Sequence, residues 1–229
     1  MELNAAEVLK VIKRKGVGAL HHANTVQTAC AFLAKGRLMA RGVVEEKGLP
    51  QTPQQSDVLD KKYGLWNDIF LDGIDIHERA RGRCFYGPVL FVFDLEVFAQ
   101  DWLASLWITR TNPQNWTDTQ AVADRYFGSI QELQLGYRKG SFDFSLVLRH
   151  VGGVLRLKPY LTKVVVDNPH YGASEVQFYS QAIGALKASA RLGQLGNLPI
   201  EPRVCVRNCK CKDQYREMSR KVLNHLFVP

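Results

Sequence analysis

The chain of 229 residues lacks several features that would assign it to a common class of protein. It has no run of 18 apolar residues, so we expect no membrane-spanning helix and no membrane partner. Its first residues, Met-Glu-Leu-Asn-Ala-Ala-Glu-Val, are too polar for the apolar part of a secretory signal. No internal repeat and no low-complexity tract occur. No G-x-G-x-x-G motif follows a predicted strand, so the doubly wound dinucleotide-binding fold has no support.

Cysteines are few and unevenly distributed. There are five of them, an odd number, and three lie close together near the C-terminal end: Cys30, Cys84, Cys205, Cys209 and Cys211. Such a pattern is not typical of a secreted protein with a disulfide framework. The cysteine usage favours a reducing compartment, and we expect a cytoplasmic protein.

Apolar residues and positive charge are plentiful. Hydrophobic residues make up 46% of the chain and charged residues 23%, which is typical of a folded domain with a core. The net charge of +8 favours anionic partners, and nucleic acid is the leading candidate. The alternative is a basic chain whose charge serves no particular partner.

The hydrophobic pattern predicts strands in the middle of the chain with helices around them. A helix over 26–35 is expected to begin after Thr25 and to end at Gly36. A strand is expected over 86–95, and its continuously apolar run 89–93 predicts burial on both faces. Other strands are expected at 19–22, 65–71, 160–166 and 175–179, and as a pair at 142–150 and 154–157. Other helices are expected at 5–15, 74–83, 97–107, 120–133 and 180–191. This order indicates an α+β domain rather than alternating βαβ units.

Residues 44–63 show no periodicity and contain Pro50 and Pro53. We expect a long loop there, either a lid over a bound ligand or a surface excursion.

Two polar residues stand at the ends of predicted strands. His22 closes the strand 19–22, and a neutral imidazole can hydrogen-bond and orient a sugar hydroxyl. Glu175 opens the predicted strand 175–179, and a carboxylate can hold a ribose 2′-hydroxyl and stabilise positive charge at the anomeric carbon. The alternatives are a histidine bound to backbone and a solvated glutamate. We expect His22 and Glu175 to meet at one sugar.

Four segments together resemble ADP-ribosyltransferases. The stretch from His22 to Arg41 is similar to the opening of many such enzymes: a strand ending in histidine, a helix, a glycine and a short run ending in a basic residue. Residues 67–72 and 86–92 resemble consecutive strands of the poly-ADP-ribose polymerase branch, and residues 175–179 resemble its final catalytic strand. The resemblance covers about 19–98 and 160–180.

The resemblance implies a split mixed sheet with flanking helices, in a catalytic domain over 1–195 with a basic Cys-containing segment, 196–229, packed on it. It also implies NAD as co-substrate. His22 would bind the ribose hydroxyls, Asn24 and Arg41 the pyrophosphate, and Glu175 would polarise the ribose and activate the acceptor as general base.

The chain departs from the family at two places. No tyrosine stands in residues 75–81, where that branch stacks one on nicotinamide, so the candidates for stacking are His77, Tyr86 and Phe70. Residue 173 is alanine, which disfavours arginine as acceptor. The likeness is closer to nucleic-acid-modifying bacterial toxins, and Tyr171 is a candidate to stack an acceptor base.

The three clustered cysteines form a separate group. Cys205, Cys209 and Cys211 have the density of metal ligands, and His225 is a candidate for a fourth ligand. Their spacing matches no common zinc signature, so zinc is not favoured over free thiols on a solvated helix. The basic residues of 203–221 indicate a face that contacts nucleic acid.

The leading hypothesis is therefore an NAD-dependent ADP-ribosyltransferase that modifies RNA or single-stranded DNA. Such an activity is typical of a toxin of a toxin–antitoxin or antiphage system, with a protein antitoxin as a further partner. One alternative is a protein-directed ADP-ribosyltransferase or an NAD glycohydrolase. Another is a non-enzymatic zinc-containing module that binds nucleic acid.

Overall fold

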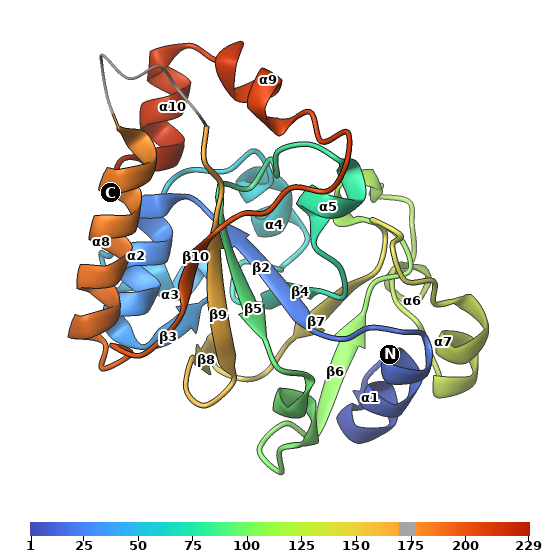
Figure 1. Ribbon diagram of the computed structural model, residues 1–229. Coiled ribbons are helices and arrows are strands. Elements are labelled where there is room, and N and C mark those ends of the chain that lie inside the picture. Colours follow the sequence, from blue (N-terminus) through green and yellow to red (C-terminus); the bar gives the residue numbers. More distant parts are fainter. Residues whose placement is uncertain (170–176) are drawn as a thin grey trace.

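A mixed sheet runs through the molecule (Figure 1). The computed structural model describes residues 1–169 and 177–229, and within them eight strands follow the order β1-β6-β7-β4-β2-β5-β9-β10. Neighbouring strands are antiparallel except β9 and β10, which are parallel. The strands of this sheet are β1 (Leu3–Asn4), β2 (Leu20–Asn24), β4 (Ile69–Asp72), β5 (Val89–Phe93), β6 (Ser105–Ile108), β7 (Ser145–Leu148), β9 (Leu161–Val166) and β10 (Ile200–Pro202).

Helices and a small second sheet surround the large one. The strands β3 (Arg37–Met39) and β8 (Val154–Arg156) pair with each other. The helices are α1 (Ala5–Arg14), α2 (Val26–Lys35), α3 (Arg41–Glu46), α4 (Asp57–Lys62), α5 (Ile76–Ala80), α6 (Val122–Arg125), α7 (Ile130–Gly136), α8 (Phe178–Leu192), α9 (Cys211–Arg216) and α10 (Arg220–Phe227), with 3₁₀ turns η1 (Leu95–Ala99) and η2 (Pro113–Asn115). The prediction of an α+β fold with a mixed sheet and flanking helices is confirmed. Among the described helices, none has the length and apolar character needed to cross a bilayer.

The clearest local predictions are confirmed. Every residue of β5 is buried, as the continuous apolar run 89–93 predicted, because β5 lies inside the sheet between β2 and β9. The helix α2 begins where Thr25 Oγ1 accepts a hydrogen bond from the Thr28 N–H group at 3.4 Å. It ends at Gly36, which has the left-handed φ of 63° that favours glycine.

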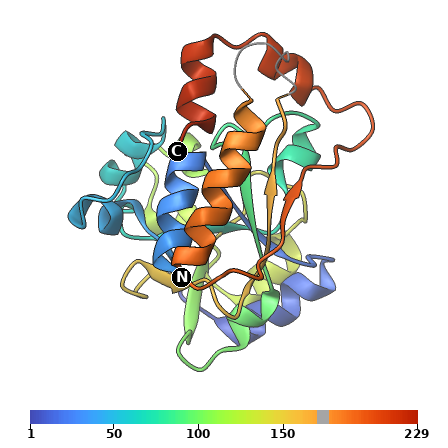
Figure 2. The same cartoon turned by 60° about the vertical axis from the view of Figure 1, so that its left-hand side comes forward.

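The helices α2 and α8 lie side by side against one face of the sheet (Figure 2). Their approach is close at the end of α8: a Cβ atom on Gly193 would lie 1.8 Å from the Leu33 carbonyl oxygen. The segment 196–229 adds β10 to the edge of the sheet beside β9, and its last helix, α10, packs on α8 and α2. The segment is thus joined to the rest of the chain by both sheet pairing and helix packing.

The predicted helix over 97–107 is wrong. The chain forms η1 and then, after Gln100, the strand β6. Leu106 and Ile108 are fully buried while Trp107 between them is only partly buried, which is the alternation of a strand. The apolar spacing of this stretch therefore reflects two different elements rather than one helical face.

Two expectations about connections also need correction. Residues 44–63 are not one long loop, because α3 and α4 lie within or across this range. The strands predicted at 142–150 and 154–157 exist, but they do not pair with each other: β7 pairs with β4 and β6, whereas β8 pairs with β3. Gly152 and Gly153 both have positive φ, 65° and 63°, and their turn sends the chain into the second sheet.

The predicted strand 175–179 is wrong where the structure describes it. Phe178 and Tyr179 belong to the first turn of α8. Four buried residues of α8 recur every four positions, which is a helical period: Phe178, Ala182, Leu186 and Ala190. Glu175 and Tyr171 lie outside the described residues.

Candidate functional site

The first candidate site surrounds His22 in β2, which pairs with β4 on one side and β5 on the other. The Nδ1 atom of His22 lies 2.8 Å from the Phe70 carbonyl oxygen of β4. A carbonyl oxygen only accepts, so Nδ1 carries the proton and Nε2 of the neutral ring is an acceptor. In this tautomer the imidazole can accept a hydrogen bond from a sugar hydroxyl.

The surroundings of His22 keep it neutral. Burial lowers the pKa of His22 below its usual value and outweighs the Phe70 carbonyl and the Asn24 side chain, which both raise it. The positive charge of Arg41 lowers it further. Asn24 and Arg41 thus both lie close enough to His22 to influence its pKa.

Asn24 lies two residues beyond His22 in β2, so both side chains project from the same face of the strand. Its side chain is 2% exposed, and within the described residues its Nδ2 atom has no hydrogen-bond partner. An unpaired buried donor costs about 1–3 kcal/mol. A ligand acceptor at this position would remove that cost, so the residue fits the role of a ligand contact.

Arg41, at the start of α3, binds both the segment before α4 and the first residue of α4. Its Nη1 atom donates to the Thr52 carbonyl oxygen at 2.9 Å, and its Nη2 atom pairs with Asp57. Beside it lies an open depression of about 290 Å³. The lining residues are Arg41, Glu45, Gln51, Pro53, Asp57, Val58, Lys61 and Trp66. A phosphate that binds Arg41 would therefore compete with Asp57.

Two of the aromatic candidates for stacking lie near these residues. Phe70 supplies its carbonyl to His22, while its ring packs against the small cluster of Leu65, Trp116 and Tyr126. Tyr86 precedes β5, and burial raises its pKa, so the phenol stays protonated. Next to it, Gly87 packs on Asn24: a Cβ atom there would lie 2.1 Å from the Asn24 carbonyl oxygen. The structure thus brings His22, Asn24, Arg41 and Phe70 together, with Tyr86 at the same end of β2.

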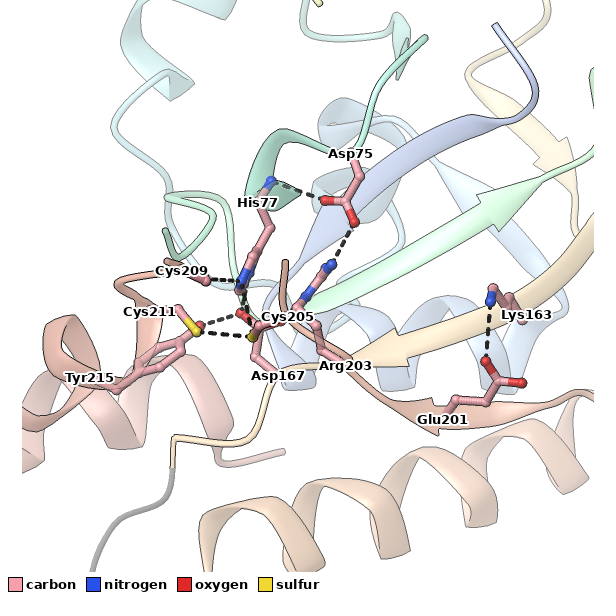
Figure 3. Close-up of polar contacts among 10 residues, drawn as sticks. All are labelled: Asp75, His77, Lys163, Asp167, Glu201, Arg203, Cys205, Cys209, Cys211 and Tyr215. Atoms are coloured by element: carbon pink, nitrogen blue, oxygen red, sulfur yellow. Dashed lines mark hydrogen bonds and ion pairs between the residues drawn. The ribbon is translucent and has the colours of Figure 1, made fainter. Parts of the chain in front are cut away.

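His77, the third stacking candidate, belongs to a different site (Figure 3). It is 1% exposed, its Nδ1 atom lies 3.0 Å from Asp167 Oδ2, and its Nε2 atom lies 3.3 Å from Cys209 Sγ. Both nitrogens are engaged and the ring has almost no accessible face. We therefore assign His77 to the second site rather than to nicotinamide.

The second candidate site is a group of four potential metal ligands: His77, Cys205, Cys209 and Cys211. The ligand atoms of all four residues lie within 4.8 Å of one another. The fourth ligand predicted from sequence, His225, is wrong: it is exposed on α10 and not part of the group. No local signal in the sequence could find His77, because it lies 128 positions before Cys205 in the chain.

Asp167, Arg203 and Tyr215 form a hydrogen-bonded network that holds His77 of this second site in place. Asp167, just after β9, accepts hydrogen bonds from His77, from Arg203 Nε and from the Tyr215 hydroxyl, the last at 2.7 Å. Burial works to raise the pKa of Asp167, but the hydrogen bond from His77 and the charge of Arg203 prevail and hold it below its usual value. Arg203 also pairs with Asp75, which caps α5. The carboxylate is therefore ionised and fixed.

Comparison of the chain with known protein families finds no match, and comparison with curated proteins finds no relative.

Proposed function

We propose that this protein is an NAD-dependent ADP-ribosyltransferase that modifies nucleic acid, either RNA or single-stranded DNA. The observation that carries the proposal is the grouping of His22, Asn24 and Arg41 around the end of β2. These residues offer an acceptor for a sugar hydroxyl, an unpaired buried donor and a guanidinium. The resemblance to ADP-ribosyltransferases implies that these three residues bind the ribose and pyrophosphate of NAD⁺.

The fold class is compatible with this activity, since a mixed sheet with flanking helices is the coarse form of an ADP-ribosyltransferase-like split sheet. The specific ADP-ribosyltransferase-like arrangement of the sheet is part of what we propose. It has to accommodate a helix, α8, that begins at Phe178, where the resemblance implied the final catalytic strand.

NAD⁺ would be a substrate, and the chain's own groups would act on it as follows. His22 Nε2 accepts a hydrogen bond from a ribose hydroxyl, and Asn24 Nδ2 donates to an oxygen of the same molecule. Arg41 exchanges its ion pair with Asp57 for the pyrophosphate. The role of Glu175, two residues before the start of the described segment at Gln177, comes from the resemblance: it polarises the ribose and stabilises positive charge at the anomeric carbon.

The transfer needs no reactant other than NAD⁺ and the nucleic acid. The bond between nicotinamide nitrogen and ribose C1′ breaks, and its electron pair leaves on nicotinamide. A nitrogen or oxygen of the nucleic acid forms the new bond to C1′, and the proton it loses passes to the Glu175 carboxylate. The products are free nicotinamide and an ADP-ribosylated nucleic acid.

The net charge of +8 supports a polyanionic acceptor, because a basic surface raises the local concentration of nucleic acid. Tyr171 would stack an acceptor base. Modification of cellular RNA or DNA would harm the cell that makes the enzyme, so we assign it to a toxin–antitoxin or antiphage system in the cytoplasm, with a protein antitoxin as partner.

The test is transfer of label from NAD⁺, labelled in its adenylate phosphate, to RNA or to single-stranded DNA. Glu175→Gln and His22→Ala should reduce nuclease-sensitive label by about a hundredfold or more, the range for loss of a catalytic acid–base group. Matched controls are the exposed residues Glu217→Gln and His225→Ala, which should label like the parent. Equal labelling by Glu175→Gln and the parent would refute the proposed site.

The same assay separates the two other reactions of this class. Label on protein would favour a protein-directed transferase, and free ADP-ribose alone would favour an NAD glycohydrolase. In either case NAD⁺ should raise the thermal midpoint, because a ligand that binds the folded state stabilises it.

A non-enzymatic nucleic-acid-binding module is the second candidate, favoured by the group of His77, Cys205, Cys209 and Cys211. Exposed basic residues lie in the two segments that carry these ligands: Arg79, Arg81, Arg207, Lys210, Lys212 and Arg216. Nucleic-acid binding with no release of nicotinamide, and a thermal midpoint indifferent to NAD⁺, would favour this candidate over the enzyme.

A further inference from the structure

We propose that His77, Cys205, Cys209 and Cys211 bind one zinc ion in a closed, four-ligand site that fastens the segment 203–216 to α5 and to the end of β9. The proposal does not depend on the transferase activity, since it is tested by metal content and stability.

Three of the six separations between the ligand atoms are close to those of a tetrahedral zinc site, and all six are within 4.8 Å. With Zn–S distances of about 2.3 Å and Zn–N distances of about 2.0 Å, tetrahedral geometry separates neighbouring ligand atoms by roughly 3.5–3.8 Å. The sulfur atoms of Cys205 and Cys211 lie 3.4 Å apart, and His77 Nε2 lies 3.3 Å from Cys209 Sγ and 3.8 Å from Cys205 Sγ. The ion can therefore be held with small adjustments of the side chains.

A disulfide does not explain the grouping. The sulfur atoms of Cys205 and Cys211 are well beyond the length of an S–S bond, about 2.05 Å. A bond between them would leave Cys209 and His77 converging on the same point without a partner. Three soft sulfur ligands and one imidazole nitrogen select zinc among abundant divalent cations, since magnesium and calcium prefer oxygen ligands.

The second nitrogen of His77 hydrogen-bonds to a carboxylate, as is common for histidine ligands of metals (Figure 3). Asp167 accepts from Nδ1 and thereby fixes the tautomer in which Nε2 carries its lone pair toward the sulfur atoms. Arg203 and the Tyr215 hydroxyl hold the carboxylate in turn. Histidine ligands of zinc commonly carry such a carboxylate on their second nitrogen.

The backbone of the two segments brings the ligands together. Asn208 has a positive φ of 61°, which turns the chain between Cys205 and Cys209. The Lys210 N–H group donates to the Arg81 carbonyl oxygen at 2.8 Å, and the Arg83 N–H group donates to Gln214 Oε1 at 2.8 Å. These bonds place the chain around Cys209 directly against the end of α5.

Zinc would add to these contacts in the part of the segment that lies before α9. Val204 is 86% exposed, and Cys205 and Arg207 are exposed as well, so the segment before α9 buries little apolar surface of its own. With all four positions taken by protein ligands, no position remains for water or substrate, which is the property of a structural site rather than a catalytic one. The ion would hold the basic residues of 207–212 in a fixed place on the surface.

The first measurement is the metal content of the full-length protein, purified under reducing conditions without chelator. We expect about one zinc per chain by elemental mass spectrometry. Cys209→Ser and His77→Ala should lower the content at least tenfold, whereas Cys30→Ser and His225→Ala, which alter a cysteine and a histidine outside the site, should leave it unchanged.

Two further measurements keep the proposal testable if a ligand variant fails to fold. His77→Cys replaces one ligand by another and should retain zinc. Chelation of the parent protein should lower its thermal midpoint, and addition of zinc alone should restore it. Less than about a tenth of an equivalent of zinc in folded parent protein that gains no stability from added zinc, or a Cys205–Cys211 disulfide in freshly purified protein, would overturn the proposal.

Discussion

Asp72, at the end of β4, predicts an unusual dependence of stability on pH. Burial raises the pKa of its carboxyl group to about 7, and the hydrogen bond that Ser145 Oγ donates to Oδ1 at 3.2 Å only partly opposes this. In the unfolded chain the group has its ordinary pKa of 3.8. The contribution of Asp72 to stability is therefore complete below pH 4 and is lost as the pH rises from 4 through 7. Between these pH values the carboxyl group ionises in the unfolded chain but stays protonated in the folded one.

The size of the effect follows from the pKa difference. Each unit corresponds to 1.36 kcal/mol, so a shift of roughly three units gives an upper bound of about 4 kcal/mol. Roughly 2–3 kcal/mol of this falls between pH 5 and pH 8. Asp72→Asn keeps the acceptor for Ser145 but cannot ionise, so it should remove this part of the pH dependence.

The assay is urea unfolding of the parent, Asp72→Asn and the exposed control Asp101→Asn at pH 5 and pH 8. The free energy of unfolding of Asp72→Asn relative to the parent should rise by about 2–3 kcal/mol from pH 5 to pH 8, whereas the control should follow the parent. If Asp72→Asn and the parent change in parallel between the two pH values, the carboxyl group is not held protonated and the reasoning is refuted.

Four other substitutions test the packing by chemical denaturation. Gly87→Ala should lower the free energy of unfolding by about 3 kcal/mol or more, because its φ of 143° disfavours a side chain and the new Cβ would strike the neighbouring backbone. Gly184→Ala, at an exposed position in the middle of α8, should instead raise it by up to about 1 kcal/mol. Arg203→Leu should cost about 3–5 kcal/mol, since it leaves Asp167 buried without its cation, and no loss would contradict the ion-pair network. Thr25→Ala should cost about 1 kcal/mol by removing the cap of α2, and an unchanged midpoint would show that the cap contributes nothing.

The sequence predicted the fold best where a few adjacent residues decide the structure. Thr25 and Gly36 bound α2 because a cap and a left-handed glycine act within one turn of helix. The buried strand at 89–93 followed from a continuous apolar run. The sequence was less informative at 97–107 and 175–179, because the same apolar residues are compatible with a helix or a strand when their partners are unknown.

The candidate sites divide in the same way. Cys205, Cys209 and Cys211 are grouped by the covalent chain, so their proximity could be seen in the sequence. Their fourth partner was predicted as His225, which is near in sequence, but it is His77, which is far. The grouping of His22 with Asn24 follows from strand alternation, whereas the Phe70 carbonyl that fixes the His22 tautomer depends on which strand lies next to β2.

The sequence alone therefore determined the α+β class, the capped helix, the buried central strand and the grouping of the three thiols, because interactions along a few residues of chain decide each of these. Only the tertiary structure decided the order of the strands, and with it the position of His77 beside the thiols. Strand β10 pairs with β9 and carries the cysteines toward α5. That pairing depends on burial summed over the whole sheet, which no short stretch of sequence contains.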